Sequence, residues 1–209
     1  MFHNPELHPR DSGHRKAASP ETPTRSETPP GVAAATHFTY EFWDRMLGIN
    51  LNGVINGIQT FMPRMLERGD GGHIVNTASG SGLVAEGGSV MYSTSKFAVV
   101  GLSESLRREL EPNRIGVSVL CRGPVGTSIL ANSRITQPDA RNAEEAKIWE
   151  AVTERVIAQL ALGVAPDEVG EMVLAAVKAN RLYILTDRVM EKFIEARTKS
   201  LLEALPPAR

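Results

Sequence analysis

The sequence contains one cysteine, few aromatic residues and almost no net charge. Among its 209 residues only Cys121 carries a thiol, aromatic side chains make up 5%, and the formal net charge is −1. A single thiol excludes an internal disulfide and fits a reducing compartment, so we expect a cytoplasmic protein. The balanced charge gives no reason to expect nucleic acid or a membrane surface as a partner. Cys121 stands in an apolar run and is expected to be buried rather than a nucleophile.

Long hydrophobic runs are absent as well. No stretch approaches the ~20 apolar residues that cross a bilayer. The first residues show no apolar segment typical of a secretory signal. Hydrophobic residues amount to 42% and charged residues to 22%, which is typical of a globular domain with a sizeable core. Composition therefore indicates a globular protein, and its chemistry depends on local motifs.

The first 36 residues differ from the rest of the chain. They hold six of the 13 prolines and three of the five histidines, without apolar periodicity. This composition predicts a disordered or unrelated tail over 1–36 and a folded domain over 37–209. His3, His8 and His14 have no cysteine or carboxylate cluster beside them, so no metal site is expected.

Apolar runs and helical patterns alternate after residue 37. Strands are predicted over 73–78, 115–121 and 182–186. Helices are predicted over 39–68 (with Thr39 as N-cap and a kink or early end at Pro63), 92–111, 144–161, 166–180 and 189–202. The polar residues 126–142 are expected to form a lid. Strands that alternate with helices favour an α/β fold, in which a parallel sheet carries helices on both faces.

Tyr92 and Lys96 are four residues apart on one face of the helix predicted over 92–111. A phenol normally titrates near ~10, and a cation beside it favours the phenolate. A tyrosine tuned in this way can pass a proton to or from a substrate oxygen. Taken alone, the pair is far more typical of an ordinary surface contact between side chains one helical turn apart.

The residues around this pair are more specific. Ser79 follows the first predicted strand, 13 residues before Tyr92, and Asn50 lies upstream in an Asn-x-x-Gly setting. A Gly-Pro-Val-Gly-Thr turn over 123–127 follows the second strand. With these motifs and spacings, residues 31–186 resemble the short-chain dehydrogenase/reductase family. Judged singly, Asn52 competes with Asn50 and Ser81 with Ser79.

The resemblance implies a role for each of the four polar residues. Tyr92 would be the acid/base, and Lys96 would favour its phenolate and bond the nicotinamide ribose. Ser79 would hold the substrate oxygen, and Asn50 would interrupt its helix and help carry a water chain between Lys96 and solvent. These roles suit the donors and acceptors of each side chain.

The resemblance also implies a cofactor, a substrate class and a fold. Gly123, Val125 and Thr127 would bind the cofactor together with Tyr92 and Lys96. The cofactor would be NAD or NADP, since no side chain delivers hydride, and the substrate a small alcohol or carbonyl compound. The implied fold is a Rossmann-like parallel sheet.

Two features depart from the family pattern. Arg122 stands where a proline usually precedes the glycine, and a non-proline residue frees an N–H and loosens the turn. No glycine-rich turn that would present N–H groups to the cofactor pyrophosphate precedes the catalytic region. We therefore expect an N-terminally truncated member whose fold is incomplete in its N-terminal half. A shifted reading frame, a wrongly assigned start or a shortened paralogue would each produce this sequence.

Two functions follow from this interpretation. The first is an NAD(P)-dependent oxidoreductase that interconverts an alcohol and a ketone or aldehyde. The second is a catalytically silent fragment that acts only through subunit association. In the family the helices near 39–68 and 92–111 pair across subunits, so the resemblance implies a homo-oligomer in either case. The strand over 73–78 is expected to be an exposed sheet edge that promotes association.

Overall fold

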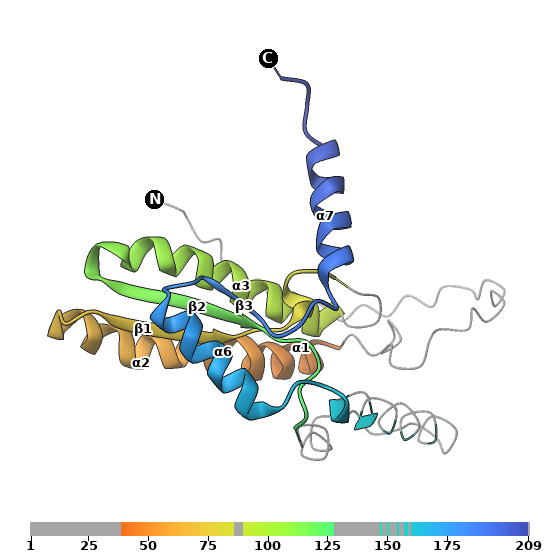
Figure 1. The fold of residues 1–209 in the computed structure, drawn as a ribbon, viewed down its shortest axis with the longest axis horizontal. Coiled ribbons are helices and arrows are strands. Elements are labelled where there is room, and N and C mark those ends of the chain that lie inside the picture. The colour runs from red at the N-terminus through yellow and green to blue at the C-terminus, as the bar shows by residue number, and fades with distance from the viewer. Residues whose placement is uncertain are drawn as a thin grey trace, which may run out of the picture.

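The structure, a computed structural model, describes residues 39–85, 90–127 and 160–208, with Lys147, Glu150, Glu154, Ile157 and Ala158. The elements in order are α1 (Tyr40–Leu47), η2 (Gly48–Asn52), α2 (Gly53–Arg68), β1 (Gly72–Thr77), η3 (Gly80–Gly82), α3 (Val90–Leu110), η4 (Glu111–Asn113), β2 (Ile115–Cys121), α6 (Pro166–Lys178), β3 (Tyr183–Leu185) and α7 (Glu191–Glu203) (Figure 1). The predicted tail over 1–36 lies outside the described residues. So do most of the predicted lid over 126–142 and of the helix over 144–161.

The described strands form one parallel sheet in the order β1-β2-β3. β1 pairs with β2 from Gly72 opposite Ile115 to Thr77 opposite Leu120. β2 then pairs with β3 through its last three residues, from Val119 to Cys121. Parallel neighbours need crossover connections, which the intervening helices supply. The three predicted strands are confirmed to within one residue at each end.

Helices cover both faces of the sheet. Successive side chains of β2 point to opposite faces, so each face contributes to a core. On one face Val117 and Val119 are fully buried against α2 and α3. On the other face Leu120 packs against Val169 and Ala176 of α6. Burying a valine of this kind contributes about 1.5–3 kcal/mol before entropy is counted. The predicted α/β architecture is therefore confirmed.

Helices α1, η2 and α2 form one continuous helical stretch with a change of register. The Thr39 hydroxyl caps it by accepting a hydrogen bond from the Phe42 amide at 3.2 Å, as predicted. η2 has π-helical hydrogen bonding. α2 then runs through Pro63 to Arg68 and ends at Gly69, so the predicted bound at residue 68 is confirmed and the alternative of an early end at Pro63 is wrong. Met62 and Met65, on either side of Pro63, pack into the core beneath the sheet and favour continuation of the helix.

The carboxyl ends of β1, β2 and β3 meet at one end of the sheet. η3 leaves β1 there, the segment from Arg122 leaves β2, and α7 follows β3 and projects away from the sheet (Figure 1). Ligands of open parallel sheets bind outside this end. Among the helices of the described residues, none has the length and apolarity to cross a membrane.

Candidate active site

Tyr92 and Lys96 lie side by side on the first turns of α3. The Lys96 ammonium is 5.7 Å from the centroid of the Tyr92 ring. It donates a hydrogen bond to the carbonyl oxygen of Thr77 at 3.3 Å, and the residue is only 9% exposed. Because Thr77 ends β1, this bond places the cation at the carboxyl end of the sheet.

Burial lowers the pKa of Lys96, and the positive charge of Arg122 lowers it further. Both effects disfavour the protonated amine, since desolvation and a like charge raise the free energy of a cation. Two basic groups from different elements, α3 and the segment after β2, therefore act on the same region. Their combined field favours negative charge on groups that bind there.

Ser79 is buried and extended, at φ −163° and ψ 164°, directly after β1. Its hydroxyl oxygen accepts a hydrogen bond from the Ser81 amide at 3.3 Å and caps η3. The hydroxyl keeps its own hydrogen available for donation. Ser81, the competing serine, lies within η3 and supplies the amide of this contact.

Glycine in η3 is required by the approach of α3. A Cβ on Gly82 would lie 2.7 Å from the carbonyl oxygen of Lys96. The Gly80 amide donates to the carbonyl oxygen of Arg122 at 2.9 Å, which connects η3 to the end of β2. The Gly-Ser-Gly sequence thus allows Ser79 to sit between β2 and the helix that carries Tyr92.

Asn50 lies in η2, the π-helical part of its helix, and is half-buried. Its side-chain amide donates to the sulfur of Met46 at 2.8 Å. The neighbouring Leu51 and Val54 pack against Val99 and Val100 of α3, so η2 and α3 are in contact. Within the described residues, however, the structure shows no hydrogen bond between Asn50 and the lysine of α3.

The turn after β2 is fixed by the segment before α6. Val125 is buried and bridges Val164. The Val164 amide donates to Pro124 and the Gly126 amide donates to Val164, each at 3.1 Å. The Gly123 amide donates to the hydroxyl of Thr186 at 3.0 Å. Of the three residues in this turn that are predicted to bind cofactor, Gly123 and Val125 are therefore part of this framework, and Thr127 is exposed at its end.

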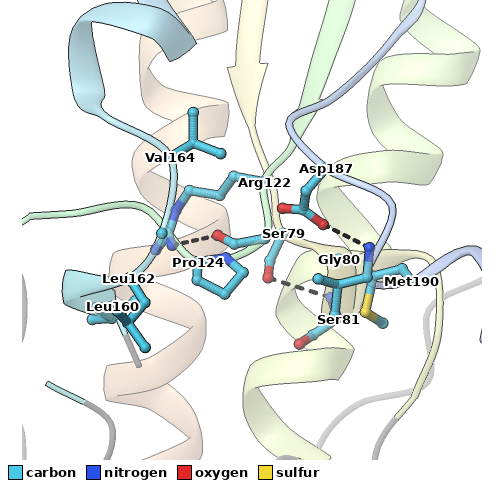
Figure 2. A pocket seen from close by; sticks show the side chains of 13 residues that line it. Ser79, Gly80, Ser81, Arg122, Pro124, Leu160, Leu162, Val164, Asp187 and Met190 are labelled. Carbon is cyan, nitrogen blue, oxygen red and sulfur yellow. Dashed lines mark hydrogen bonds between the residues drawn. The ribbon is translucent and has the colours of Figure 1, made fainter. Parts of the chain in front are cut away.

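A cavity of about 750 Å³ opens beside Ser79 (Figure 2). Its polar lining comes from Ser79, Ser81, Arg122 and Asp187, and its apolar lining includes Leu160, Leu162, Val164, Val189 and Met190. In the part of the chain that the structure describes, Tyr92 and Lys96 are not among its lining residues. The volume lies in the usual range for small-molecule sites.

Sequence reasoning missed Asp187 and the apolar wall of this cavity. Asp187 accepts hydrogen bonds from the Thr186 hydroxyl at 3.0 Å and from the Val189 amide at 2.9 Å. A side chain on Gly123 would collide with its carboxylate. The position of Asp187 just after a predicted parallel strand was the available signal, because such positions meet at the ligand end of the sheet.

The hydrogen-bond donors of the Lys96 ammonium indicate whether this site suits a nicotinamide cofactor. An ammonium has three N–H donors, and across the described residues one of them is taken by a carbonyl, that of Thr77. A buried cation with remaining donors fits the hydroxyl groups of a ribose. The residues present therefore fit the nicotinamide ribose. Over the described ranges, no group of three or more His, Cys, Asp or Glu residues is arranged to hold a metal ion.

Comparison with known proteins gives one family and several dehydrogenases. A profile of the short chain dehydrogenase family matches residues 30–138, just over half of the chain. A C alpha-dehydrogenase from Sphingobium sp. strain SYK-6 is 33% identical over 173 residues, which span 81% of this chain and 55% of that protein. A 3beta-hydroxysteroid dehydrogenase 2 from Eggerthella lenta is 39% identical over 106 residues, which span 51% of this chain and 40% of that protein.

A solved structure extends the similarity to three dimensions. A short chain dehydrogenase/reductase from Burkholderia phymatum, in complex with NAD, matches with a TM-score of 0.70 and 27% identity. The match covers 82% of this chain and 62% of that one. This chain spans about half the length of the relatives it matches. The residues matched by the family profile include Asn50, Ser79, Tyr92 and Lys96.

Proposed function

The chain belongs to the short-chain dehydrogenase family, and on this premise we propose that it is an NAD(P)-dependent oxidoreductase that interconverts an alcohol and a ketone or aldehyde. The observation that supports this most directly is the buried ammonium of Lys96, 5.7 Å from the ring centroid of Tyr92 at the carboxyl end of the sheet. When bound, the nicotinamide would supply or accept the hydride.

Tyr92 is the proposed acid/base. During reduction its hydroxyl gives a proton to the carbonyl oxygen of the substrate, and during oxidation the phenolate takes that proton back. The Lys96 cation on the same helix face stabilises the phenolate electrostatically. Ser79 donates its hydroxyl hydrogen to the same substrate oxygen and orients the reacting carbon. Ser79 is buried and caps η3, which keeps this donor in a fixed place.

The cofactor is proposed to bind along α3 and the turn after β2. Lys96 would hold the nicotinamide ribose with the donors that Thr77 leaves free. Gly123, Val125 and Thr127 would support the nicotinamide end, on a turn that Val164 fixes from the other side. The Burkholderia phymatum relative was solved with NAD, which supports a nicotinamide cofactor and leaves NAD or NADP open for this chain.

Asn50 is proposed as a positioning residue rather than one that touches substrate. It lies where the helical hydrogen bonding changes register in η2, next to α3. Single π-helical turns inside α-helices are frequent at functional sites. A water between η2 and Lys96 would connect the buried ammonium to solvent.

Assembly into a homo-oligomer and a cytoplasmic location belong to the same proposal. A groove between α2 and α3 is lined by the half-buried side chains of Ile55, Ile58, Leu102 and Leu106. This apolar surface supports pairing with the same helices of a second copy. The buried Cys121, the one thiol of the chain, suits a reducing compartment.

A product assay tests the proposed reaction. The purified chain is mixed with NADH or NADPH and a set of ketones and aldehydes, and the alcohol formed is quantified by chromatography. Alcohol formation that requires both protein and reduced cofactor supports the proposal. A folded chain that binds neither cofactor and forms no alcohol would favour the silent-subunit function instead. The dehydrogenase names of the relatives favour the first outcome.

A further inference from the structure

Arg122 lines the cavity, and most of its hydrogen-bond donors are unused among the residues that the structure describes. A guanidinium has five N–H donors and no acceptor. Over the described ranges, the guanidinium bonds the carbonyl oxygen of Gly123 at 3.4 Å and makes no ion pair. The side chain is half-buried and lines the same cavity as Ser79. It therefore has the capacity to bind a further acceptor group inside the cavity.

The surroundings of Arg122 make an unpaired charge costly. Leucine, valine and methionine side chains form the facing wall of the cavity. Figure 2 shows the guanidinium extending toward the segment that carries Leu162 and Val164. In such apolar surroundings an unpaired cation loses hydration, and a bound anion restores favourable interactions.

Asp187 is the carboxylate that lines the same cavity, and its oxygens are hydrogen-bonded to other groups. Both of its oxygens accept hydrogen bonds within the turn after β3, from Thr186 and Val189. In Figure 2 it lies on the side of Gly80 and Met190, away from the guanidinium. The positive charge of Arg122 lowers the pKa of Lys96, so Lys96 is a second cation near this region. The cavity is thus positive at the guanidinium end, carries the Asp187 carboxylate on its other side, and is apolar along the wall between Leu160 and Val164.

We infer that Arg122 is a specificity-determining residue that binds a carboxylate on the substrate. The proposed substrate class is an alcohol or carbonyl compound with an apolar body and a carboxylate. A guanidinium binds a carboxylate through two parallel hydrogen bonds, which fixes orientation as well as charge. The inference rests on the proposed function, because Ser79 of the same cavity is the residue proposed to hold the reacting oxygen.

A matched pair of probes tests this inference without any turnover. Hydrocinnamate has an aromatic body and a carboxylate, and hydrocinnamamide replaces the carboxylate with a neutral amide of the same shape. Their binding to the full chain is measured by calorimetry. We expect hydrocinnamate to bind at least ~10-fold more tightly, which corresponds to about 1.4 kcal/mol. Failure of hydrocinnamate to bind, or equal binding of the two probes, overturns the inference.

Variants connect the preference to Arg122. Arg122→Met keeps the length of the side chain, and we expect it to abolish the preference, whereas Arg122→Lys should retain part of it. Arg108→Met, an exposed arginine on α3, is the matched control and should change nothing. A preference that persists in a folded Arg122→Met protein contradicts the inference. If Arg122→Met does not fold, the wild-type preference must fall as salt rises, because salt screens charge.

Two further arms separate the possible failures. Pyrophosphate stands for the cofactor as an alternative source of the anion. If Arg122→Met loses pyrophosphate binding but keeps the hydrocinnamate preference, the residue serves the cofactor and the inference is wrong. Tyr92→Phe should bind hydrocinnamate like the wild type. An intact, Arg122-dependent preference in a chain that forms no alcohol would uphold the anion site and reject the proposed reaction.

Discussion

The ammonium of Lys96 donates to the carbonyl oxygen of Thr77 at 3.3 Å, so the lysine of α3 is bonded to the last residue of β1. This bond needs α3 to run close beside the segment that leaves the strand. Gly82 permits the approach, since any side chain there would meet the Lys96 carbonyl. The position of the proposed catalytic lysine thus depends on a glycine that has no chemical role.

Replacing Gly82 with alanine should destabilise the protein. The new Cβ would lie 2.7 Å from the Lys96 carbonyl oxygen and 2.9 Å from its carbonyl carbon, which are backbone atoms that cannot rotate away. Overpacking of this kind costs about 1–3 kcal/mol. The free energy of unfolding, from urea denaturation, measures the effect.

Gly101→Ala is the matched control on the exposed side of α3. No atom lies within 4 Å of the position a Cβ would take there. Alanine should therefore stabilise the helix by about 0.5–1 kcal/mol. If the two substitutions change the free energy of unfolding equally, then close packing of η3 against α3 does not require glycine at position 82.

Stability should fall in alkaline solution because of Cys121. Burial, with a smaller effect of the Glu104 charge, raises the pKa of this thiol to about 12. An unfolded thiol titrates near ~8.5, so between these values the folded state holds a proton that the unfolded state has lost. Stability is complete below ~8.5 and decreases as the pH rises above it.

The comparison that isolates this effect is wild type against Cys121→Ala. From pH 7 to pH 10 the wild type should lose on the order of 1–2 kcal/mol more unfolding free energy than the variant, which has no thiol to titrate. Urea denaturation at both pH values, under reducing conditions, gives the numbers. Parallel losses in the two proteins would show that the thiol ionises equally in both states.

The β1 edge should promote self-association. Among the described residues β1 pairs only with β2, it is six residues long, and Val75 is 38% exposed. An exposed apolar edge is a template for further strand pairing, and a lysine on it opposes such pairing. We expect Val75→Lys to shift the chain toward smaller species in size-exclusion chromatography with light scattering.

Leu185→Lys provides the comparison on β3, the other edge of the described sheet. β3 has only three residues, and a short edge offers few pairing groups. This substitution should leave the association almost unchanged. A wild-type chain that elutes as one uniform monomer, with cooperative melting, contradicts the exposed-edge prediction.

Much of the fold was predictable because its signals are local. Thr39 as N-cap, Gly69 in the left-handed conformation at the end of α2, and the apolar run of β2 each depend on neighbouring residues. The resemblance implied that Asn50 interrupts its helix, but the π-helical form of this interruption in η2 was not predicted. Leu51 and Val54 pack there against a core that includes Val99 and Val100 of α3, a contact between distant parts of the sequence.

The candidate site divides in the same way. The helical spacing of Tyr92 and Lys96 is enough to predict that they share a face, and the structure places them together. The cavity wall could not be predicted, because Leu162 and Met190 reach Ser79 only through the order of the parallel strands. The presence of Arg122 was visible in the sequence, but only the structure shows that no ion pair forms with it among the described residues.

The most direct test of the account compares Tyr92→Phe with the wild type in cofactor-dependent reduction of a carbonyl substrate. Phenylalanine keeps the ring that lies beside Lys96 and removes only the proton donor. We expect kcat to fall by about 10²–10⁴, with thermal melting unchanged. Tyr183→Phe is the control and should keep its turnover. The wild-type Tyr183 hydroxyl donates to Glu104 at 2.6 Å. Near-normal turnover in a folded Tyr92→Phe protein would contradict the proposed acid/base.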